Sequence, residues 1–340
     1  MKILKLGLKV LLGLIVLAAL VLALLLNLHE DSGELDDYYV TASPVSANDV
    51  RIRFMGNTNI LITDGVTSLM TDAWFSRPSL LTLALADIEP DMTEISNGMQ
   101  MGVIDKLAAI FPVHSHYDHA MDAPEVARQT GALLVGSEST ANIGRGWGLS
   151  EDQIRVVNSG EPMQFGKFQV RMIESVHFEF PDPELRAAAL SDPVIEEPLV
   201  PPVSALDYKM GGAYSLVIEH PKGSVLIHGS AGFVPSQLDA YDVDVVFLGV
   251  GGIAGQAPEY QAGYWQHVVR AVDPRWVYPV HWDSLTDPLG QEPVMPNLLV
   301  AWLMGFDSTA SVMYAINNAS ADDINVGLLP MWQDVVLFGD

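Results

Sequence analysis

Hydrophobic positions form two patterns that divide the chain near residue 50. Residues 10–26 are one unbroken apolar run, and with the leucines on either side the segment approaches the roughly 20 residues that a helix needs to span a bilayer. Beyond residue 50, short apolar runs alternate with segments that have helical spacing. Such alternation of strand and helix patterns is typical of an α/β chain.

The apolar run predicts a membrane anchor over residues 1–29. Lys2, Lys5 and Lys9 precede the run and acidic residues follow it. This asymmetry predicts a cytoplasmic amino end and an extracytoplasmic domain, either periplasmic or on the outer face of the inner membrane. A buried core helix would show a polar stripe, and a cleaved signal peptide would have a small-x-small site, which does not follow Leu26. We therefore expect an uncleaved signal-anchor helix.

Residues 30–49 are acidic and then rich in Ser, Pro and Ala, so we expect a tether there. Residues 50–340 are expected to form one catalytic domain. The hydrophobic pattern predicts strands at 50–54, 59–63 and 68–71, and helices at 79–86, 123–130, 259–272 and 297–305.

Composition narrows the classes of function. About 290 residues follow the anchor and tether, enough to bury roughly three quarters of the unfolded surface in one large domain. The chain has 42 acidic and 17 basic residues, a formal net charge of −25. A nucleic-acid partner would need a basic patch to neutralise phosphates, so we expect none. Cysteine is absent, which excludes disulfides, thiolate zinc sites and cysteine nucleophiles.

The most specific chemistry lies in the run His114-Ser115-His116-Tyr117-Asp118-His119, directly after an apolar strand candidate. In extended chain His114 and His116 point to the same face, because side chains alternate. Asp118 and His119 follow on the turn that leaves the strand. Imidazole and carboxylate together suit zinc, manganese or iron(II). Packing alone would favour apolar side chains at these positions, so the run predicts a nearly preassembled dinuclear metal site.

This run resembles the signature of the metallo-β-lactamase superfamily, and further residues of that pattern recur in order along the chain. The resemblance implies a four-layer αβ/βα sandwich. Asp72, at the end of a predicted strand, matches the early aspartate that braces the metal loop. His177 and His281, each closing an apolar run, match the family's third and last histidine positions.

One position departs from the family pattern. Ser230 stands where a bridging aspartate is expected, and a neutral hydroxyl is a poor bridge between two cations. Three interpretations remain open. A second metal is held weakly by Asp118, His119 and His281; one metal alone is bound by His114, His116 and His177; or His228 lends a nitrogen. We favour two zinc ions, one tight and one weaker, with Mn²⁺ or Fe²⁺ not excluded, and for His228 a backbone-bonded strand histidine is an equal alternative.

The expected chemistry is hydrolysis. A catalytic zinc lowers the pKa of its bound water to about 7, giving a hydroxide that attacks a carbonyl carbon. Asp118 would orient that nucleophile and carry its proton. We expect a small-molecule or lipid substrate with an ester, lactone or amide bond. The alternatives are a phosphodiesterase acting on a membrane lipid head group, and a degraded metal-containing protein that only binds a ligand.

Two loops complete the sequence-based picture. Residues 178–212 hold six prolines directly after His177, and a long loop there is typical either of a lid or substrate wall or of a surface insertion without a role. The glycine-rich segment 249–255 matches neither a P-loop nor a dinucleotide fingerprint. We interpret it as a tight turn near the metal site.

Overall fold

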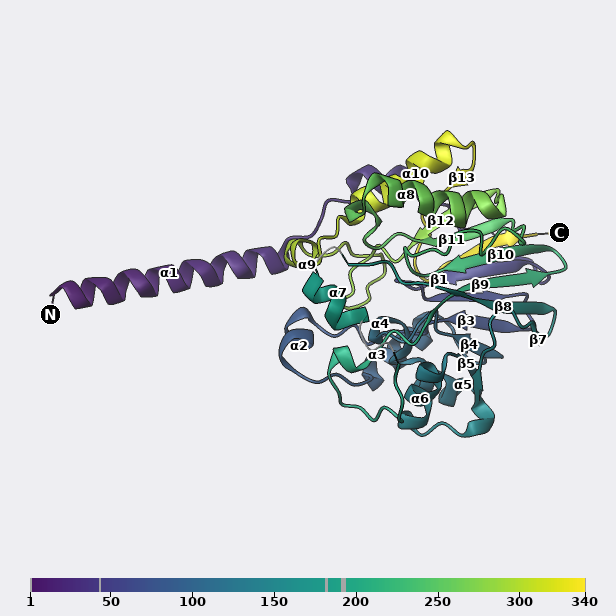
Figure 1. Ribbon diagram of the computed structural model, residues 1–340, viewed down its shortest axis with the longest axis horizontal. Coiled ribbons are helices and arrows are strands. Elements are labelled where there is room, and N and C mark those ends of the chain that lie inside the picture. The colour runs from purple at the N-terminus through teal and green to yellow at the C-terminus, as the bar shows by residue number, and fades with distance from the viewer. Residues whose placement is uncertain (1, 43, 181–182, 191–193, 340) are drawn as a thin grey trace.

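The architecture was analysed in a computed structural model, which describes residues 2–42, 44–180, 183–190 and 194–339. Its strands pair into two mixed sheets, each of seven strands. The first sheet has the order β14-β1-β2-β3-β4-β5-β6, and the second has the order β13-β12-β11-β10-β9-β8-β7. The two sheets pack face to face, with helices on both outer sides (Figure 1). This arrangement confirms the four-layer αβ/βα sandwich.

The strands of the first sheet are β1 Val50–Phe54, β2 Ile60–Thr63, β3 Ser68–Thr71, β4 Ala109–Phe111, β5 Leu133–Gly136, β6 Ile154–Val156 and β14 Asp334–Phe338. Those of the second sheet are β7 Met163–Phe165, β8 Phe168–Ser175, β9 Ala213–His220, β10 Gly223–His228, β11 Val245–Gly249, β12 Trp276–Val280 and β13 Asn325–Val326. The three strands that the hydrophobic pattern predicted are confirmed, the second of them beginning one residue later.

The α-helices are α1 Lys2–Asn27, α2 Leu80–Leu85, α3 Met92–Met101, α4 Tyr117–Ala120, α5 Ala123–Thr130, α6 Glu138–Trp147, α7 Pro183–Leu190, α8 Pro258–Tyr264, α9 Leu298–Met304 and α10 Ser308–Ala321. Short helical turns lie at η1 Gly33–Tyr38, η2 Glu151–Gln153, η3 Ala205–Asp207, η4 Ile253–Gly255, η5 Trp265–Val269 and η6 Arg270–Val272. The predicted helix at 259–272 is thus one α-helical segment continued by a π turn and a 3₁₀ turn.

Three of the four apolar clusters among the described residues hold the layers together. One lies between the sheets, where alternate strand residues such as Ile52 and Ile227 meet. A second cluster packs α8 and α10 on the second sheet, and a third packs α3 and α5 on the first. The strands carry their apolar residues at the spacing that two buried faces require, and this patterning is the main reason that the chain folds as a sandwich.

Residues 30–49 were predicted to be a tether, and part of this segment packs on the domain. Leu35, in η1, is fully buried in the cluster beside the second sheet. Val40 N donates to Leu328 O at 2.9 Å, and Tyr39 bridges the same residue. A buried leucine and backbone hydrogen bonds fix this segment, although its polar composition suggested a flexible chain.

The helix α1 leaves the domain as a separate rod (Figure 1). The stretch from Lys9 to Asn27 is long enough and apolar enough to cross a membrane, and it is not buried against the domain. The helix predicted from the apolar run is confirmed. Its role as a membrane anchor stays a prediction, because a signal sequence has the same length and composition.

Candidate metal centre

The predicted site residues lie at one end of the sandwich, on loops that follow the C-terminal ends of strands. Asp72 follows β3, the histidine run follows β4, His177 follows β8 and His281 follows β12. β3 and β4 are parallel, as are β10, β11 and β12. Parallel strands bring the loops after their C-terminal ends to the same edge. The topology therefore gathers residues that are far apart in the sequence.

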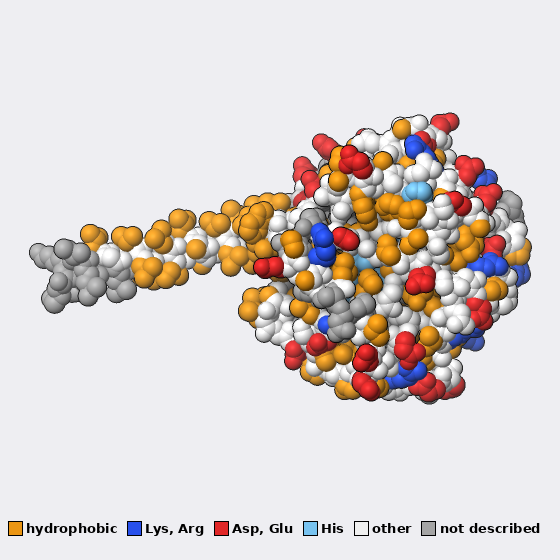
Figure 2. Space-filling view, in the orientation of Figure 1, with side chains coloured by type: hydrophobic (Ala, Val, Ile, Leu, Met, Phe, Trp, Pro, Cys, Tyr) orange, Lys and Arg blue, Asp and Glu red, His pale blue; other side chains and the backbone are white. Residues whose placement is uncertain are grey.

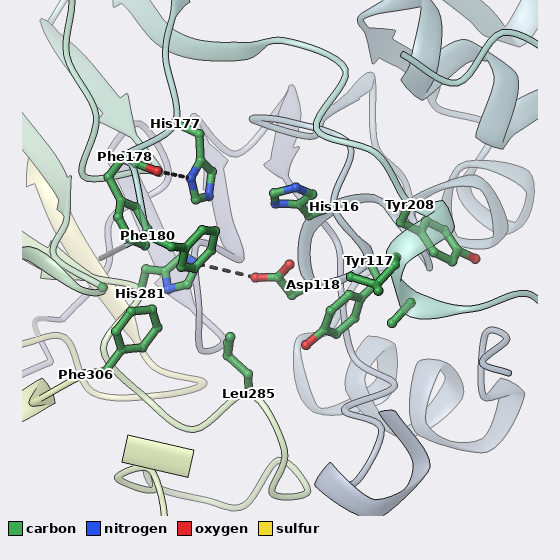
Figure 3. Close-up of a pocket in the computed structure, with 13 residues that line it drawn as sticks. His116, Tyr117, Asp118, His177, Phe178, Phe180, Tyr208, His281, Leu285 and Phe306 are labelled. Atoms are coloured by element: carbon green, nitrogen blue, oxygen red, sulfur yellow. Dashed lines mark hydrogen bonds and ion pairs between the residues drawn. The ribbon is translucent and has the colours of Figure 1, made fainter. Parts of the chain in front are cut away.

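His114, His116 and His177 form a first triad, with one ligand atom from each lying within 4.8 Å of the others. His114 Nε2 lies 3.1 Å from His116 Nδ1. Two nitrogens at about 2.05 Å from a tetrahedral zinc would be roughly 3.3 Å apart, so this pair has the spacing of zinc ligands. Figure 3 shows the rings of His116 and His177 directed toward one another across the pocket floor.

Asp118, His119 and His281 form a second triad within the same distance limit. Asp118 Oδ2 lies 3.3 Å from His119 Nε2 and 3.4 Å from His281 Nε2. His119 and Asp118 are on the short helix α4, whereas His281 directly follows β12 of the second sheet. The two triads meet where the rings of His114 and His119 approach to 3.9 Å between centroids. The six residues that the sequence proposed as ligands are all brought together.

The electrostatics of the first triad favour neutral imidazoles, the form that binds metal. Burial lowers the pKa of His177 to about 3. Burial, followed by the neighbouring imidazoles, also holds the pKa of His114 well below its usual range. Rings that stay unprotonated at neutral pH offer lone pairs to a cation.

The second triad carries negative charge. Burial opposes ionisation of Asp118, but His119 and His281 outweigh it and hold the pKa of that carboxyl well below its usual range. Burial likewise opposes protonation of His119, but Asp72 and Asp118 raise the pKa of the ring to about 10. Two buried carboxylates beside one imidazole favour a positive charge there, and a divalent cation held by Asp118, His119 and His281 would take the place of the proton on the ring.

Asp72 braces the metal loop. Its Oδ2 lies 2.7 Å from His119 Nδ1, and its Oδ1 accepts from Val113 N at 2.9 Å. The first contact directs His119 Nε2 toward Asp118. That nitrogen is buried and has no hydrogen-bond partner of good geometry among the described residues. A buried, unpartnered imidazole nitrogen fits a metal ligand, since a metal bond would replace the missing hydrogen bond.

Asn57 joins the two halves of the second triad, and sequence reasoning missed it. Its side-chain amide donates to Asp118 O, and its backbone oxygen accepts from His281 N at 2.9 Å. Asp283 in turn accepts from Asn57 N at 2.6 Å and pairs with Arg77 at 2.9 Å. All of these groups except His281 are buried. The only signal in the sequence is a polar turn between two apolar strands.

The glycine-rich loop after β11 has the predicted role of a tight turn beside the site. A Cβ on Gly251 would lie 2.8 Å from both Nδ1 and O of His281. Only a residue without a side chain allows this close approach without displacing the ligand. The backbone of His281 itself has a φ of +59°, a left-handed conformation that is costly for a non-glycine residue.

The structure places His228 and Ser230, the two other residues proposed near the metal site, outside both triads. His228 lies outside both triads: Ser215 Oγ is 2.7 Å from its Nδ1, and Gly232 O is 2.6 Å from its Nε2. This is the strand histidine bonded to its neighbours, not the extra ligand. Ser230 Oγ accepts from Phe178 N at 3.4 Å, beside the loop of His177. Among the described residues, Asp118 is the one carboxylate in the two triads, and Ser230 does not contribute another ligand.

An apolar pocket of about 140 Å³ lies over the triads. Ligand residues of both triads form its floor, and aromatic and aliphatic side chains form its walls (Figure 3). Phe178, Phe180, Leu206 and Tyr208 come from the proline-rich segment 178–212, of which residues 181–182 and 191–193 lie outside the description. The described part of that segment is therefore a pocket wall, one of the two roles that the sequence left open.

Comparisons with known proteins come from sequence and from structure. A family model described as the metallo-beta-lactamase superfamily matches residues 104–281 of the 340. A metal-dependent hydrolase of Pyrobaculum islandicum is 24% identical over 240 residues, covering 69% of this chain and 85% of the relative. Another metal-dependent hydrolase, from Myxococcus xanthus, is 29% identical over 213 residues, covering 62% of this chain and 66% of the relative.

Solved structures share the fold at low sequence identity. A metallo hydrolase from Ignicoccus hospitalis has a TM-score of 0.53 at 15% identity, covering 86% of this chain and 99% of its own. The metallo-beta-lactamase fold protein YhfI from Bacillus subtilis has a TM-score of 0.51 at 13% identity, covering 86% and 100%. The di-iron β-hydroxylase CmlA from Streptomyces venezuelae has a TM-score of 0.50 at 13% identity, covering 87% and 55%.

Proposed function

Because the chain belongs to the metallo-beta-lactamase superfamily, we propose that it is a metal-dependent hydrolase that cleaves an uncharged ester, lactone or amide with a large apolar group. The observation that supports this proposal is the position of the apolar pocket directly over the two triads. The pocket residues that are described include no lysine or arginine. A carboxylate or phosphate on the substrate would have no basic side chain to pair with.

The chain's own residues provide a binding set for two zinc ions. His114, His116 and His177 would hold the tighter ion, because three imidazole nitrogens match its ligand preference. Asp118, His119 and His281 would hold the weaker one. When bound, zinc supplies Lewis-acid activation of a carbonyl and a lowered pKa for water. CmlA, which shares the fold, is a di-iron enzyme, so the choice of zinc is part of the proposal.

Asp118 is the residue that we assign to proton handling. It lies on the pocket floor, and its carboxyl stays ionised under the influence of His119 and His281. An ionised carboxylate accepts a hydrogen bond from an attacking water and so orients its lone pair toward the carbonyl carbon. The same oxygen then carries the proton to the leaving alcohol or amine. Tyr117 and the phenylalanines of the wall exclude bulk water from this exchange.

We also propose that α1 anchors the enzyme with its domain on the extracytoplasmic side. The lysines at its amino end and the acidic residues after it support this orientation. The excess of acidic residues favours a small-molecule or lipid substrate over nucleic acid. Cleavage of a lipid phosphodiester, or ligand binding without turnover, has no supporting contact in the described pocket. Both serve as alternative outcomes of the test below.

The test compares His116→Ala with His267→Ala in the full-length protein in detergent. His267 lies in the turn η5 after α8 and outside both triads, so its loss controls for removal of an imidazole. We expect the wild type and His267→Ala to bind two zinc ions and to cleave apolar esters or lactones. His116→Ala should lose the tighter ion and about a hundredfold or more of its activity. Turnover of phosphodiesters alone, full metal loading without turnover of any substrate, or turnover that survives the loss of metal would contradict the proposal.

A further inference from the structure

A second apolar cavity, of about 130 Å³, continues the pocket over the metal centre toward α2 and α9. The two cavities share five lining residues: Tyr117, Gly251, His281, Leu285 and Phe306. Leu80 and Leu83 of α2 line the second cavity on one side, and Val300 and Leu303 of α9 line it on the other. The shared residues place the two cavities side by side between the second triad and these helices, and we refer to the adjoining cavities together as the passage.

The same two helices also expose large apolar side chains to solvent. Leu81 and Leu85 of α2 are 68% and 77% exposed, and Trp302 and Leu303 of α9 are 77% and 52% exposed. We refer to these four residues as the apolar rim. Single exposed leucines are ordinary, but such residues grouped around the mouth of an apolar passage mark an interaction surface. An exposed tryptophan is typical of the boundary between lipid and water.

The apolar rim lies at the end of the domain from which α1 leaves. Leu298 N, at the start of α9, donates to Leu28 O at 2.8 Å, and Glu30 N donates to Pro296 O at 3.1 Å. α1 and α9 are in contact, and α2 lies at the same end (Figure 1). Figure 2 shows hydrophobic side chains along α1 that continue onto this end of the domain. The junction therefore places the rim close to the surface of any membrane that α1 enters.

We propose that the apolar rim inserts into the bilayer leaflet around α1, and that the passage admits the acyl chain of a membrane-dissolved substrate from that leaflet. The proposal rests on the proposed function, which it narrows to neutral acyl lipids and similar apolar esters. A chain entering between α2 and α9 would meet mainly apolar side chains, with Asp283, Thr286 and Ser308 as polar exceptions in the second cavity, and would place its carbonyl group over the second triad.

Charge favours hydrocarbon contact over attraction to lipid headgroups. The described lining of the passage includes no lysine or arginine, and Asp31 and Asp87 lie near the ends of α1 and α2. A face that bound anionic headgroups would need basic residues. We therefore expect the rim to insert into zwitterionic membranes, and to do so with little dependence on salt.

The chain lacks cysteine, so a single cysteine can be introduced at any position and labelled alone. Environment-sensitive fluorophores would be placed at positions 81, 85, 302 and 303 of the full-length protein in phosphatidylcholine vesicles. Val66 and Val103, 88% and 66% exposed, serve as controls. They precede β3 and β4, whereas the metal ligands follow those strands, so the controls lie at the opposite end of the sheet.

Quenchers attached to the lipid acyl chains should quench the four rim labels several-fold more strongly than the two controls. Equal quenching at all six positions would overturn the proposal. A rim label that moves to an apolar environment without lipid quenching would also overturn it, because that result indicates contact with a second copy of the chain.

Kinetics test the passage. We expect the double variant Leu81→Glu, Leu85→Glu to lower the ratio of long-chain to short-chain ester hydrolysis in vesicles by about tenfold. Val66→Glu should leave the ratio as in the wild type. An unchanged ratio in the double variant would contradict entry from the leaflet. If the wild type hydrolyses no ester, the proposed function fails, while the fluorescence experiment still decides whether the rim lies in the membrane.

Discussion

At the scale of single residues, the surroundings of each buried histidine decide its role. His119 has the Asp72 carboxylate 2.7 Å from one nitrogen, and its second nitrogen is buried 3.3 Å from Asp118 Oδ2 without a well-formed hydrogen bond. His228 is equally buried, but a hydroxyl and a carbonyl engage both of its nitrogens. The sequence named His119 as a ligand from the run that contains it but left the role of His228 open, because the partners of His228 come from other segments.

The burial of His228 predicts how the free energy of unfolding changes with pH. Burial lowers the pKa of His228 to about 4, so the folded state prefers the neutral ring. The stability that this preference contributes is complete above the unfolded pKa of about 6.5 and is lost as pH falls toward the folded value. His228→Asn removes the titrating group. Between pH 7.5 and 5, we expect the wild type to lose about 2 kcal/mol more unfolding free energy than the variant.

Chemical denaturation at the two pH values measures this difference. Metal content checks the structural role: His228→Asn should keep both zinc ions at neutral pH. A constant stability difference across the range, or loss of a metal in the variant, would show that the ring has another role.

The contacts of Asn57 predict how tightly the second, weaker zinc ion is bound. Asn57→Gly tolerates the left-handed φ of +51° but loses the amide that donates to Asp118 O. Without it, the loop of Asp118 is less firmly held against His281. We expect the second zinc ion to bind about 10- to 100-fold more weakly, while the ion held by His114, His116 and His177 stays bound.

Metal titration against a competing chelator distinguishes the two ions. The exposed Asn158→Gly serves as the control, since its amide contacts Glu161 far from the ligands. If both zinc ions bind equally weakly in Asn57→Gly, the substitution disturbs the whole domain rather than only the contact between the Asp118 and His281 segments.

At the scale of elements, the metal ligands lie on the segments that follow strands, and the close packing of the loop after β11 against His281 can be tested. Gly251→Ala adds a carbon that would meet His281 at 2.8 Å, so the ligand must move. Gly290→Ala is the matched control, because its added carbon would meet its nearest atom at 3.6 Å. We expect Gly251→Ala to lose the second zinc ion and most activity, and Gly290→Ala to keep both. Full metal loading of Gly251→Ala would show that the loop adjusts.

The sequence predicted elements best where the apolar pattern is local. β1, β3 and α5 have the predicted bounds because their buried positions follow one period from end to end. α3 and α10 were not predicted. Gly98 in the middle of α3 is explained only by the ring of Phe75 against it, which comes from a distant loop. α10 is rich in small residues, whose burial depends on tertiary contact rather than on a marked apolar stripe.

At the scale of the whole molecule, all six proposed ligands were named from the sequence, because their order resembles a known family. The contacts that hold the triads in register were not foreseen. Asn57, Arg77 and Asp283 connect segments more than 200 residues apart through single hydrogen bonds and an ion pair. Packing of residues 30–49 on the domain escaped prediction for the same reason: one buried leucine outweighs a polar composition.

The convergence of the two triads on two cations is the central claim, and anomalous diffraction from zinc-loaded crystals of the protein tests it most directly. We expect two peaks, one about 2.0–2.2 Å from nitrogens of His114, His116 and His177, and one at the same distance from Asp118, His119 and His281. A single peak would reduce the site to one metal. Peaks away from these side chains would contradict the account.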